Sequence, residues 1–551
     1  MRHLGVARSL LFASRMSGQN FFAFAPLKPL RRTTRAVLLL ALEVVLIVPS
    51  CLSQKIDAGQ KSADKYWAES GLGSRELELL LAPKSCLQDH RHYLGCVNAI
   101  SAMVERYDLV LDQNGQLSPM TPEAIEKRLT EKKELSTWEQ KLAGEEANPE
   151  FSFLDLWKKI DQTLVRPNER SAVIGAGING FLSITKDPHS YILPLSYYEE
   201  IISRSDTRPT HLGFISKRVK GGAFVRKVFA GSPAAVAGLR KGDRILEVNG
   251  QVVTTLHPAQ YSEIMKVKTG GRIGLKIERT EGPVVSQRYL DIIKTDATYP
   301  NVLSKILSGH QNVGLITIHK FAQDTCRMVK TNLISLKEEG LRGLILDLRD
   351  NPGGQVDEAA CILNLFIEKG QLLFETRYLD PTHPVDTYRA DRDPIFQGPL
   401  TILINGGSAS ASEIVAGSLK DLGRATLVGE RSFGKGTFQD GRLWGADPRV
   451  AFFETEGLYY FPSGWTPQLV GLEPDIKVVS REDESFREED LYYHPIRPAD
   501  LWDGPQGLSW MANEPCTPQV PTVDEDPQIL KAWAMMNCDV GGIGHDRHGT
   551  L

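Results

Sequence analysis

The sequence predicts an α/β protein that is built from several folded parts. From residue 312 onward, continuous apolar runs of strand length alternate with segments of helical spacing, which indicates a parallel sheet with helical crossovers. Ahead of this region, residues 206–298 read as short strands separated by glycine-containing turns. Residues 60–150 read as mostly helical. At 551 residues the chain is too long for one ordinary core, so three or four modules are expected.

Residues 1–52 have the pattern of an export signal. A basic segment with arginines at 31, 32 and 35 precedes the apolar run Ala36–Val48, and small residues follow it. The run is shorter than the roughly 20 residues that cross a bilayer, and Glu43 interrupts it. We therefore expect export to an extracytoplasmic location, the bacterial periplasm or the membrane surface, with an uncleaved N-terminal membrane anchor as the alternative.

The seven cysteines fit an oxidising compartment. Cys86 and Cys96 flank a short loop, and Cys516 lies near Cys538 in the tail, so each pair is spaced to form a disulfide or to remain as buried thiols. Two further cysteines, at 326 and 361, fall in helical patterns, where we expect core packing.

Composition and charge also exclude some partners. A formal charge of −4 over the whole length gives no signature of nucleic-acid binding. The sequence has no Cys-x-x-Cys pair and no histidine-rich spacing, so neither a metal nor another cofactor is expected. We interpret His545 and His548 as part of a frayed tail rather than as metal ligands.

Two helical regions precede the strand-rich part. In the first, residues 60–150, helices are predicted over Arg75–Leu81 and Val97–Tyr107. The second, residues 151–205, leads into the strand-rich part, with helices over Phe153–Leu164 and Ala172–Ser183. The first region carries no residues with an evident chemical role, and the second leads into the segment Asp187–Pro194.

Residues 206–298 resemble a PDZ domain along their whole length. The unit contains a strand at Phe224–Val228, a segment Leu239–Gly250 that ends in an Asn-Gly turn, and a half-buried strand at Arg272–Glu278. In PDZ domains a peptide adds to a strand edge, and backbone amides of a glycine-containing loop bind its terminal carboxylate.

The loop that corresponds to this carboxylate site is His211-Leu-Gly-Phe214, in which histidine replaces the usual first glycine. The resemblance implies that Leu212, Gly213, Phe214 and Ile215 bind substrate. Because three of these side chains are apolar, protein or peptide substrates with apolar C-termini are expected.

Residues 299–480 form the predicted α/β domain, which carries the candidate chemical motifs described below, and residues 481–551 are interpreted as a peripheral C-terminal extension. The strands and helices expected within residues 299–480 are, in chain order, the strand Val313–Ile318, the helix Cys326–Glu339, the strand Leu344–Leu348, the helix Val356–Ile367 and the strand Leu400–Ile404.

A serine-rich segment marks the first candidate for chemistry. The run Ser-Ala-Ser-Ala-Ser-Glu, residues 408–413, leads from the buried strand Leu400–Ile404 into a helix. A serine at this junction lies at the carboxyl end of a parallel strand, where open α/β sheets place their sites. It also lies at a helix N-terminus, which favours developing negative charge. The alternative is that these serines only cap the helix.

A lysine between two glycines marks the second candidate. Lys435 is flanked by Gly434 and Gly436, and such a lysine is commonly a surface turn residue. A lysine acts as a general base only if burial lowers its pKa by several units. The neighbouring Phe433 and Phe438 would exclude water from the amine.

The two segments together resemble the signature of the carboxy-terminal processing proteases, also called tail-specific proteases. The signature consists of the serine run followed by Phe-Gly-Lys-Gly-Thr-x-Gln. The resemblance implies that Ser410 is the nucleophile, that Lys435 is the base 25 residues later, and that Gln439 completes a Ser–Lys–Gln set.

Three further stretches carry the same resemblance, and together they extend it over about residues 151–480. They are Asp347–Gly354 after a strand, Asp187–Pro194 ahead of the PDZ unit, and Pro462–Asp475 as a closing motif. The resemblance implies a crotonase-like α/β protease domain with an inserted PDZ domain and an N-terminal helical region. It also implies an oxyanion hole made by the amide of Ala411 and by that of Gly353 or Gly354.

The expected function is that of a serine endopeptidase that cuts exported proteins near their C-terminal ends, with the PDZ domain selecting the tails. A catalytically silent PDZ scaffold is the alternative, although intact Ser410, Lys435 and Gln439 argue against it. An acyl-CoA enzyme on the related fold is disfavoured by the inserted PDZ unit. A Ser–His–Asp hydrolase is disfavoured because the sequence has no Gly-x-Ser-x-Gly elbow and His383 lies in no matching motif.

Overall fold

The computed structural model describes residues 60–111, 117–119, 152–198, 212–295, 301–479, 487–490, 496 and 526–538, apart from short gaps within these ranges. The expected export segment, the carboxylate-loop residue His211, the Cys516–Cys538 pairing and the two tail histidines therefore lie outside the described residues. Within the described ranges, no helix has the length and hydropathy needed to cross a membrane.

The catalytic domain is built on a six-stranded sheet in the order β10-β11-β12-β15-β16-β19. Only β10 runs antiparallel to its neighbour, and the other neighbours are parallel. The strands are β10 (Val302–Ile306), β11 (Val313–Ile318), β12 (Gly343–Asp347), β15 (Leu400–Ile404), β16 (Thr426–Gly429) and β19 (Ile476–Lys477). The predicted α/β class is thus confirmed, and the apolar strands are buried because both faces are covered.

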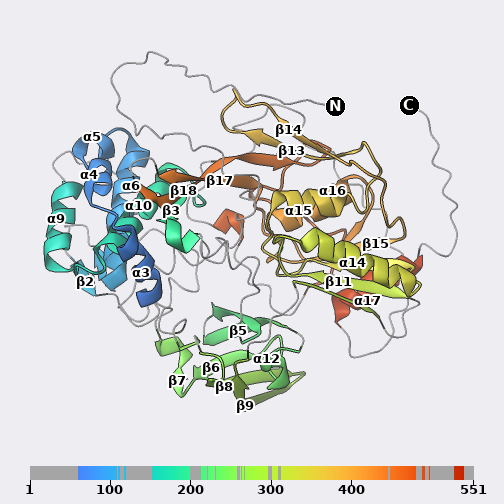
Figure 1. Cartoon of the computed structure of the whole chain (residues 1–551). Helices are drawn as coiled ribbons and strands as arrows, with labels where there is room; N and C mark the ends of the chain where they lie inside the picture. The colour runs from blue at the N-terminus through green and yellow to red at the C-terminus, as the bar shows by residue number, and fades with distance from the viewer. Residues whose placement is uncertain are drawn as a thin grey trace.

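Three helices cover one face of this sheet, namely α14 (Thr325–Glu338), α15 (Val356–Leu363) and α16 (Ala411–Asp421). The other face is covered by α17 (Pro527–Cys538), whose Ala532 and Met536 share a core cluster with Ile345 and Leu403 (Figure 1). The interpretation of residues 481–551 as wholly peripheral is therefore wrong for this helix. Alternate strand residues point to opposite faces, so a parallel sheet needs a cover on each side.

A second sheet joins the catalytic domain to the N-terminal helical region. Its strand order is β14-β13-β18-β17, and β18 also pairs with β3. The strands are β3 (Tyr191–Pro194), β13 (Leu372–Tyr378), β14 (Asp386–Arg389), β17 (Thr437–Trp444) and β18 (Asp447–Tyr460). Figure 1 shows the β17–β18 hairpin extending from the catalytic domain to the helices, where Trp444 and Phe452 enter their core.

The helical region packs mainly through one pair of helices, α6 (His90–Val104) and α10 (Arg170–Thr185). Gly180 lets them approach closely, because a Cβ there would lie 2.6 Å from the carbonyl oxygen of Asn98. The other elements are α3 (Gln60–Ser70), α4 (Arg75–Leu80), α5 (Pro83–Cys86), η2 (Glu105–Tyr107), β1 (Leu109–Leu111), β2 (Leu117–Pro119) and α9 (Phe153–Thr163). The helices predicted around residues 75–81, 97–107, 153–164 and 172–183 are confirmed.

The PDZ unit forms a separate sheet in the order β4-β5-β6-β8-β9, with β7 paired to β6. Its elements are β4 (Phe214–Val219), β5 (Gly222–Val228), α12 (Pro233–Val236), β6 (Arg244–Val248), β7 (Gln251–Val252), η3 (Val253–Thr255), β8 (Arg272–Glu281) and β9 (Val284–Ile293). It contacts the catalytic domain through Arg226, whose Nη2 lies 2.8 Å from Oδ1 of Asp350.

Two disulfides lie among the described residues. Cys86–Cys96 confirms the predicted pairing. Cys326–Cys361 corrects the expectation of thiol packing, because it links α14 to α15 across 35 residues of sequence. Both cysteines do lie in helices, as predicted, but the two helices pack side by side and bring the sulfurs together.

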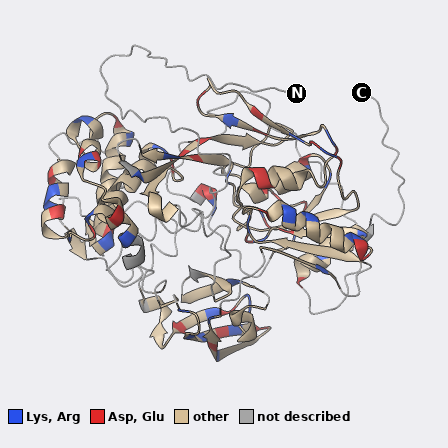
Figure 2. Cartoon of the chain, viewed as in Figure 1, with Lys and Arg blue, Asp and Glu red and all other residues tan. Residues whose placement is uncertain are grey.

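Charged side chains of both signs are scattered over the helical region, the PDZ unit and the catalytic domain (Figure 2). This distribution agrees with the small net charge of the sequence.

Candidate active site

Ser410 lies where β15 gives way to α16, as the sequence predicted. It is the N-cap residue of α16 and has φ 54° and ψ −115°, a strained conformation for a residue with a side chain. The turn is held against Gly353, at which a Cβ would lie 2.7 Å from the amide nitrogen of Ala411 and 3.0 Å from Cβ of Ser410. A glycine is therefore required at 353 for the two loops to meet.

The carboxylate of Glu413 joins the serine segment to the lysine segment. Its Oε2 accepts hydrogen bonds from the backbone amides of Ser410 and Lys435, each at 2.9 Å. Its Oε1 accepts from the Ser432 hydroxyl at 2.5 Å and the Gly434 amide at 2.7 Å. Because the side chain is fully buried, desolvation raises the pKa of Glu413 to about 7, although all four hydrogen bonds act against that rise.

Lys435 is buried, with 1% of its surface exposed, so the surface-turn alternative is excluded. Its Nζ donates to the carbonyl oxygen of Thr437 at 2.9 Å and to Oε1 of Gln439 at 2.8 Å. Burial lowers the pKa of Lys435 to about 8, while the charges of Glu488, Asp187 and Glu413 oppose that fall. With a pKa of about 8, about a tenth of this amine is uncharged at pH 7, and the uncharged fraction rises to about half at pH 8.

Gln439 holds this amine from β17. Its Nε2 donates to the hydroxyls of Thr437 and Thr455, each at 3.1 Å. The amide is thereby oriented with its oxygen toward Lys435. The structure thus brings together the predicted lysine and glutamine.

The backbones of Ser410 and Lys435 are also bridged by Tyr459 on β18. The single proton of the Tyr459 hydroxyl is directed to the carbonyl oxygen of Lys435 at 2.8 Å, with the carbonyl oxygen of Ser410 as a second, longer acceptor at 3.4 Å. Among the described residues, no hydrogen bond directly connects the Ser410 hydroxyl with the Lys435 amine, which is turned to Thr437 and Gln439. Ser410 and Lys435 are therefore held on adjoining loops, and the Lys435 amine is hydrogen-bonded to Gln439 rather than to the serine.

Of the predicted oxyanion-hole residues, Ala411 and Gly353 lie beside Ser410. Ala411 is the first helical residue of α16, and its amide makes no hydrogen bond among the described residues. The Gly353 amide donates to Oδ1 of Asn351 at 2.9 Å. Gly354 lies against Phe321, where a Cβ would approach the carbonyl oxygen to 1.9 Å.

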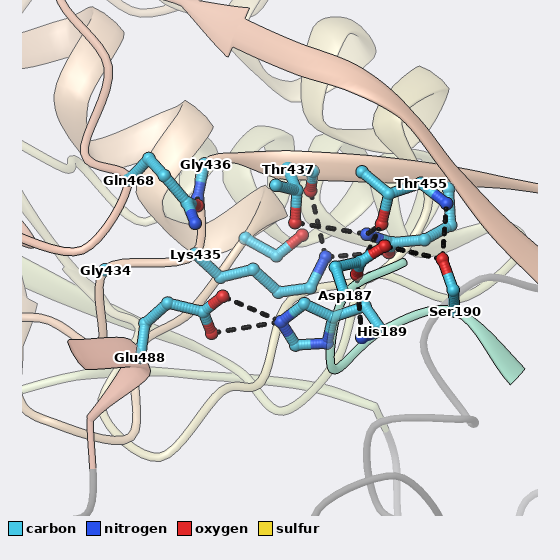
Figure 3. A network of polar contacts seen from close by, with 12 residues as sticks. Asp187, His189, Ser190, Gly434, Lys435, Gly436, Thr437, Thr455, Gln468 and Glu488 are labelled. Atoms are coloured by element: carbon cyan, nitrogen blue, oxygen red, sulfur yellow. Dashed lines mark hydrogen bonds and ion pairs between the residues drawn. The ribbon is translucent and has the colours of Figure 1, made fainter. Parts of the chain in front are cut away.

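A polar network from distant segments surrounds the lysine (Figure 3). Asp187, ahead of β3, accepts hydrogen bonds from the hydroxyls of Ser190 and Thr455 at 2.5 and 2.8 Å. His189 lies next to Glu488, with its Nε2 2.8 Å from Oε1 and 3.1 Å from Oε2. Sequence reasoning quoted the segment 187–194 only as a family motif and assigned none of its residues a role.

The sequence held a signal for Glu413 but not for Glu488. Glu413 follows Ser410 by three residues, the spacing of a capping box, so a bond between its carboxylate and the Ser410 amide was accessible from the pattern. Glu488 lies about 300 residues from His189, and only the fold brings the two together.

The predicted PDZ substrate residues lie at the start of β4, an edge strand of the PDZ sheet that pairs only with β5 among the described strands. Phe214 and Ile215 are half-buried there, whereas Leu212 belongs to the PDZ core. The carbonyl of Gly213 accepts hydrogen bonds from Phe229 N at 2.9 Å and Ser232 Oγ at 3.0 Å. Within the described residues, no cluster of three or more histidine, cysteine or acidic side chains is arranged to hold a metal ion.

Comparison with known proteins identifies the family. Residues 312–478 match peptidase family S41, and residues 224–279 match the PDZ domain. The chain is 32% identical over 347 residues to a carboxy-terminal-processing protease of Bartonella bacilliformis, covering 62% of this chain and 77% of that protein. The chain belongs to the family of carboxy-terminal processing proteases. Members of this family are serine peptidases, so the predicted enzyme class is confirmed.

Other relatives share the same region. The carboxy-terminal processing protease CtpA of Bacillus subtilis is 27% identical over 58% of this chain and 68% of its own length. A probable CtpA-like serine protease of Staphylococcus aureus is 29% identical over 59% of this chain and 64% of its own length. Among solved structures, the photosystem II D1 C-terminal processing protease is 25% identical and covers 60% of this chain and 87% of that one, with a TM-score of 0.42.

Replacing Glu413 by alanine is expected to destabilise the protein strongly. The change would leave four donors without an acceptor in a buried site, so we expect the free energy of unfolding to fall by about 3–5 kcal/mol. Denaturant unfolding measures this loss, and Glu338→Ala on the exposed face of α14 is the matched control, with an expected change below about 0.5 kcal/mol. Equal unfolding midpoints for the two variants would show that Glu413 does not hold the site together.

Proposed function

We propose that this peptidase is an extracytoplasmic endopeptidase that cuts proteins near their C-terminal ends with Ser410 as nucleophile and Lys435 as general base. The observation that carries the proposal is the fully buried Lys435 amine, fixed on a loop that Glu413 and Tyr459 tie to the Ser410 turn. Burial lowers the pKa of this lysine to about 8, so an uncharged amine is available to accept a proton.

The chemistry would start with a rotation of the Lys435 side chain from Thr437 to the Ser410 hydroxyl. The neutral amine takes the hydroxyl proton while Oγ attacks the carbonyl carbon of the scissile peptide. The resulting ammonium then protonates the leaving amine, and an acyl-enzyme on Ser410 remains. Water attacks this ester with the same lysine as base, which releases the acid product and restores the hydroxyl. Gln439 would hold the amine between these transfers.

The negative oxygen of each tetrahedral intermediate would be bound at the start of α16. The Ala411 amide, which has no other acceptor among the described residues, is the first donor. The second is the amide of Gly354, or that of Gly353 if it exchanges its bond to Oδ1 of Asn351 for the oxyanion. The N-terminus of α16 adds a favourable dipole. Losing one such donor costs on the order of 10²–10³ in rate in comparable enzymes.

Substrate tails would be selected by the PDZ domain. Among the described strands β4 pairs only with β5, so its other edge suits addition of an extended peptide. Phe214 and Ile215 on that strand would be half-buried apolar contacts for a C-terminal side chain. We propose substrates with apolar C-termini.

The disulfides Cys86–Cys96 and Cys326–Cys361 support a location in an oxidising compartment. The relatives from Bacillus, Staphylococcus and Bartonella are bacterial, so we propose the periplasm or the outer face of the membrane. Attachment through the N-terminal segment is part of the same proposal.

Hydrolysis of an unfolded protein with an apolar tail tests the dyad. We expect Ser410→Ala to reduce cleavage to background and Lys435→Ala to lower kcat about 10²–10⁴-fold. In the wild type, kcat/KM is expected to rise with pH through about 8, because the lysine acts in its unprotonated form. Ser463→Ala and Lys369→Ala, two exposed positions, are the matched controls and should cut like the wild type.

Undiminished cleavage by the Ser410 variant would refute the nucleophile, and undiminished cleavage by the Lys435 variant would reassign the base. A wild-type enzyme that cuts no substrate at any pH would favour the PDZ scaffold alternative.

Amidation of the substrate's C-terminus tests selection by the PDZ domain. We expect kcat/KM to fall about tenfold, mostly through KM, because the amide removes the charge that the loop at 211–214 would bind. The variant Ile215→Asp should bind substrates with a free or an amidated C-terminus equally weakly, so that kcat/KM no longer differs between the two substrates. Identical kcat/KM values for the free and amidated tails in the wild type would remove the PDZ domain from substrate selection.

A further inference from the structure

A short segment beyond the family match is bound to the loop that carries the lysine. In residues 487–490, the guanidinium of Arg487 donates to the carbonyl oxygens of Arg431 and Ser432 at 2.6 and 2.8 Å. The amide of Glu488 donates to the carbonyl oxygen of Phe433 at 3.0 Å. The segment thus contacts three consecutive residues that precede Gly434 and Lys435.

The same segment places a carboxylate in the interior. Glu488 is fully buried, and its carboxylate is bonded to His189, whose side chain is also buried. A buried charge is costly unless a partner and hydrogen bonds compensate it, so a glutamate at such a position needs a specific reason. His189, the partner of Glu488, belongs to the loop of residues 187–190, which also carries Asp187.

This carboxylate faces the catalytic lysine. In Figure 3 the Lys435 side chain passes above the His189 ring. Glu488 lies at the left of the view, bonded to that ring, and Asp187 lies at the right, beside the amine. The ionisable groups that face Lys435 are Glu413 from α16, Tyr459 from β18, Asp187 and His189 from the loop before β3, and Glu488 from η4 (Glu488–Asp490).

We propose that Glu488 is a positioning residue of the catalytic site: paired with His189 and clamped to residues 431–433, it fixes the Lys435 loop and adds a negative charge to the surroundings of the lysine. This inference rests on the proposed role of Lys435 as the base. It assigns a part of the site to the C-terminal extension, which lies beyond the residues that match the peptidase family.

The electrostatic consequence has a definite sign. A nearby negative charge stabilises the ammonium form and therefore raises the pKa of a lysine, and Glu488 is the first of the three charges that oppose the effect of burial on Lys435. Removing that charge lowers the pKa, so the amine loses its proton at a lower pH. The acid limb of the pH profile then moves to lower pH.

The test compares Glu488→Gln with the wild type in the pH dependence of kcat/KM on an unfolded protein with an apolar tail. Glutamine keeps the size of the side chain and one oxygen acceptor but removes the charge. We expect the acid midpoint to fall by about one pH unit, which raises kcat/KM at pH 6.5 roughly tenfold relative to its plateau. The matched control Glu473→Gln removes an exposed carboxylate 3.9 Å from Arg431 and should leave the midpoint unchanged.

A second variant separates the clamp from the charge. Arg487→Ala removes the two bonds to residues 431 and 432 but leaves the buried carboxylate, so we expect a lower kcat with an unchanged midpoint. A purely structural role for the segment would lower kcat in both variants without moving either midpoint, and that result would overturn the inference. If Glu488→Gln does not fold, an Arg487→Ala enzyme with wild-type kcat at every pH would overturn it equally.

The outcome for Lys435→Ala keeps the two proposals apart. An active Lys435→Ala enzyme would refute the proposed base and this inference with it. An inactive Lys435→Ala enzyme together with an unmoved Glu488→Gln profile would refute only the role of Glu488.

Discussion

The site depends on one buried carboxylate that accepts four hydrogen bonds. Glu413 receives the amides of Ser410 and Lys435 on one oxygen, and the Ser432 hydroxyl and Gly434 amide on the other. Each loop alone would have orphan donors in an apolar interior, so the two loops are stable only when they share this acceptor. The strained turn at Ser410 is compatible with folding because this shared acceptor and the packing of Gly353 hold it.

The remaining polar groups come from parts of the chain that are far apart in sequence. Gln439 and Thr455 lie on the β17–β18 hairpin, and the same hairpin pairs with β3 and enters the core of the helical region. That arrangement carries the loop with Asp187 and His189 to the lysine. The helical region therefore has a physical connection to the site, although its own sequence shows no chemical motif.

Local patterns in the sequence were enough to predict the α/β class, the strands β11, β12 and β15 of the catalytic sheet, and the strand–helix junction at Ser410. Lys435 was assigned to the site only through the family resemblance, because its local pattern is equally that of a surface turn. They could not predict the disulfide Cys326–Cys361, because it depends on how α14 and α15 pack. The helix α17 was missed for a related reason: it is short, follows a long aperiodic stretch, and is stabilised by the sheet face that it covers. The pair His189–Glu488 likewise exists only in the folded chain.

The rate at which a fluorophosphonate probe labels the serine tests the central claim most directly, because it needs no substrate selection and no deacylation. The account predicts labelling at Ser410 whose rate rises with pH through about 8 and falls at least a hundredfold in Lys435→Ala. A rate that does not depend on pH between 6 and 9, or equal labelling in the lysine variant, would contradict it.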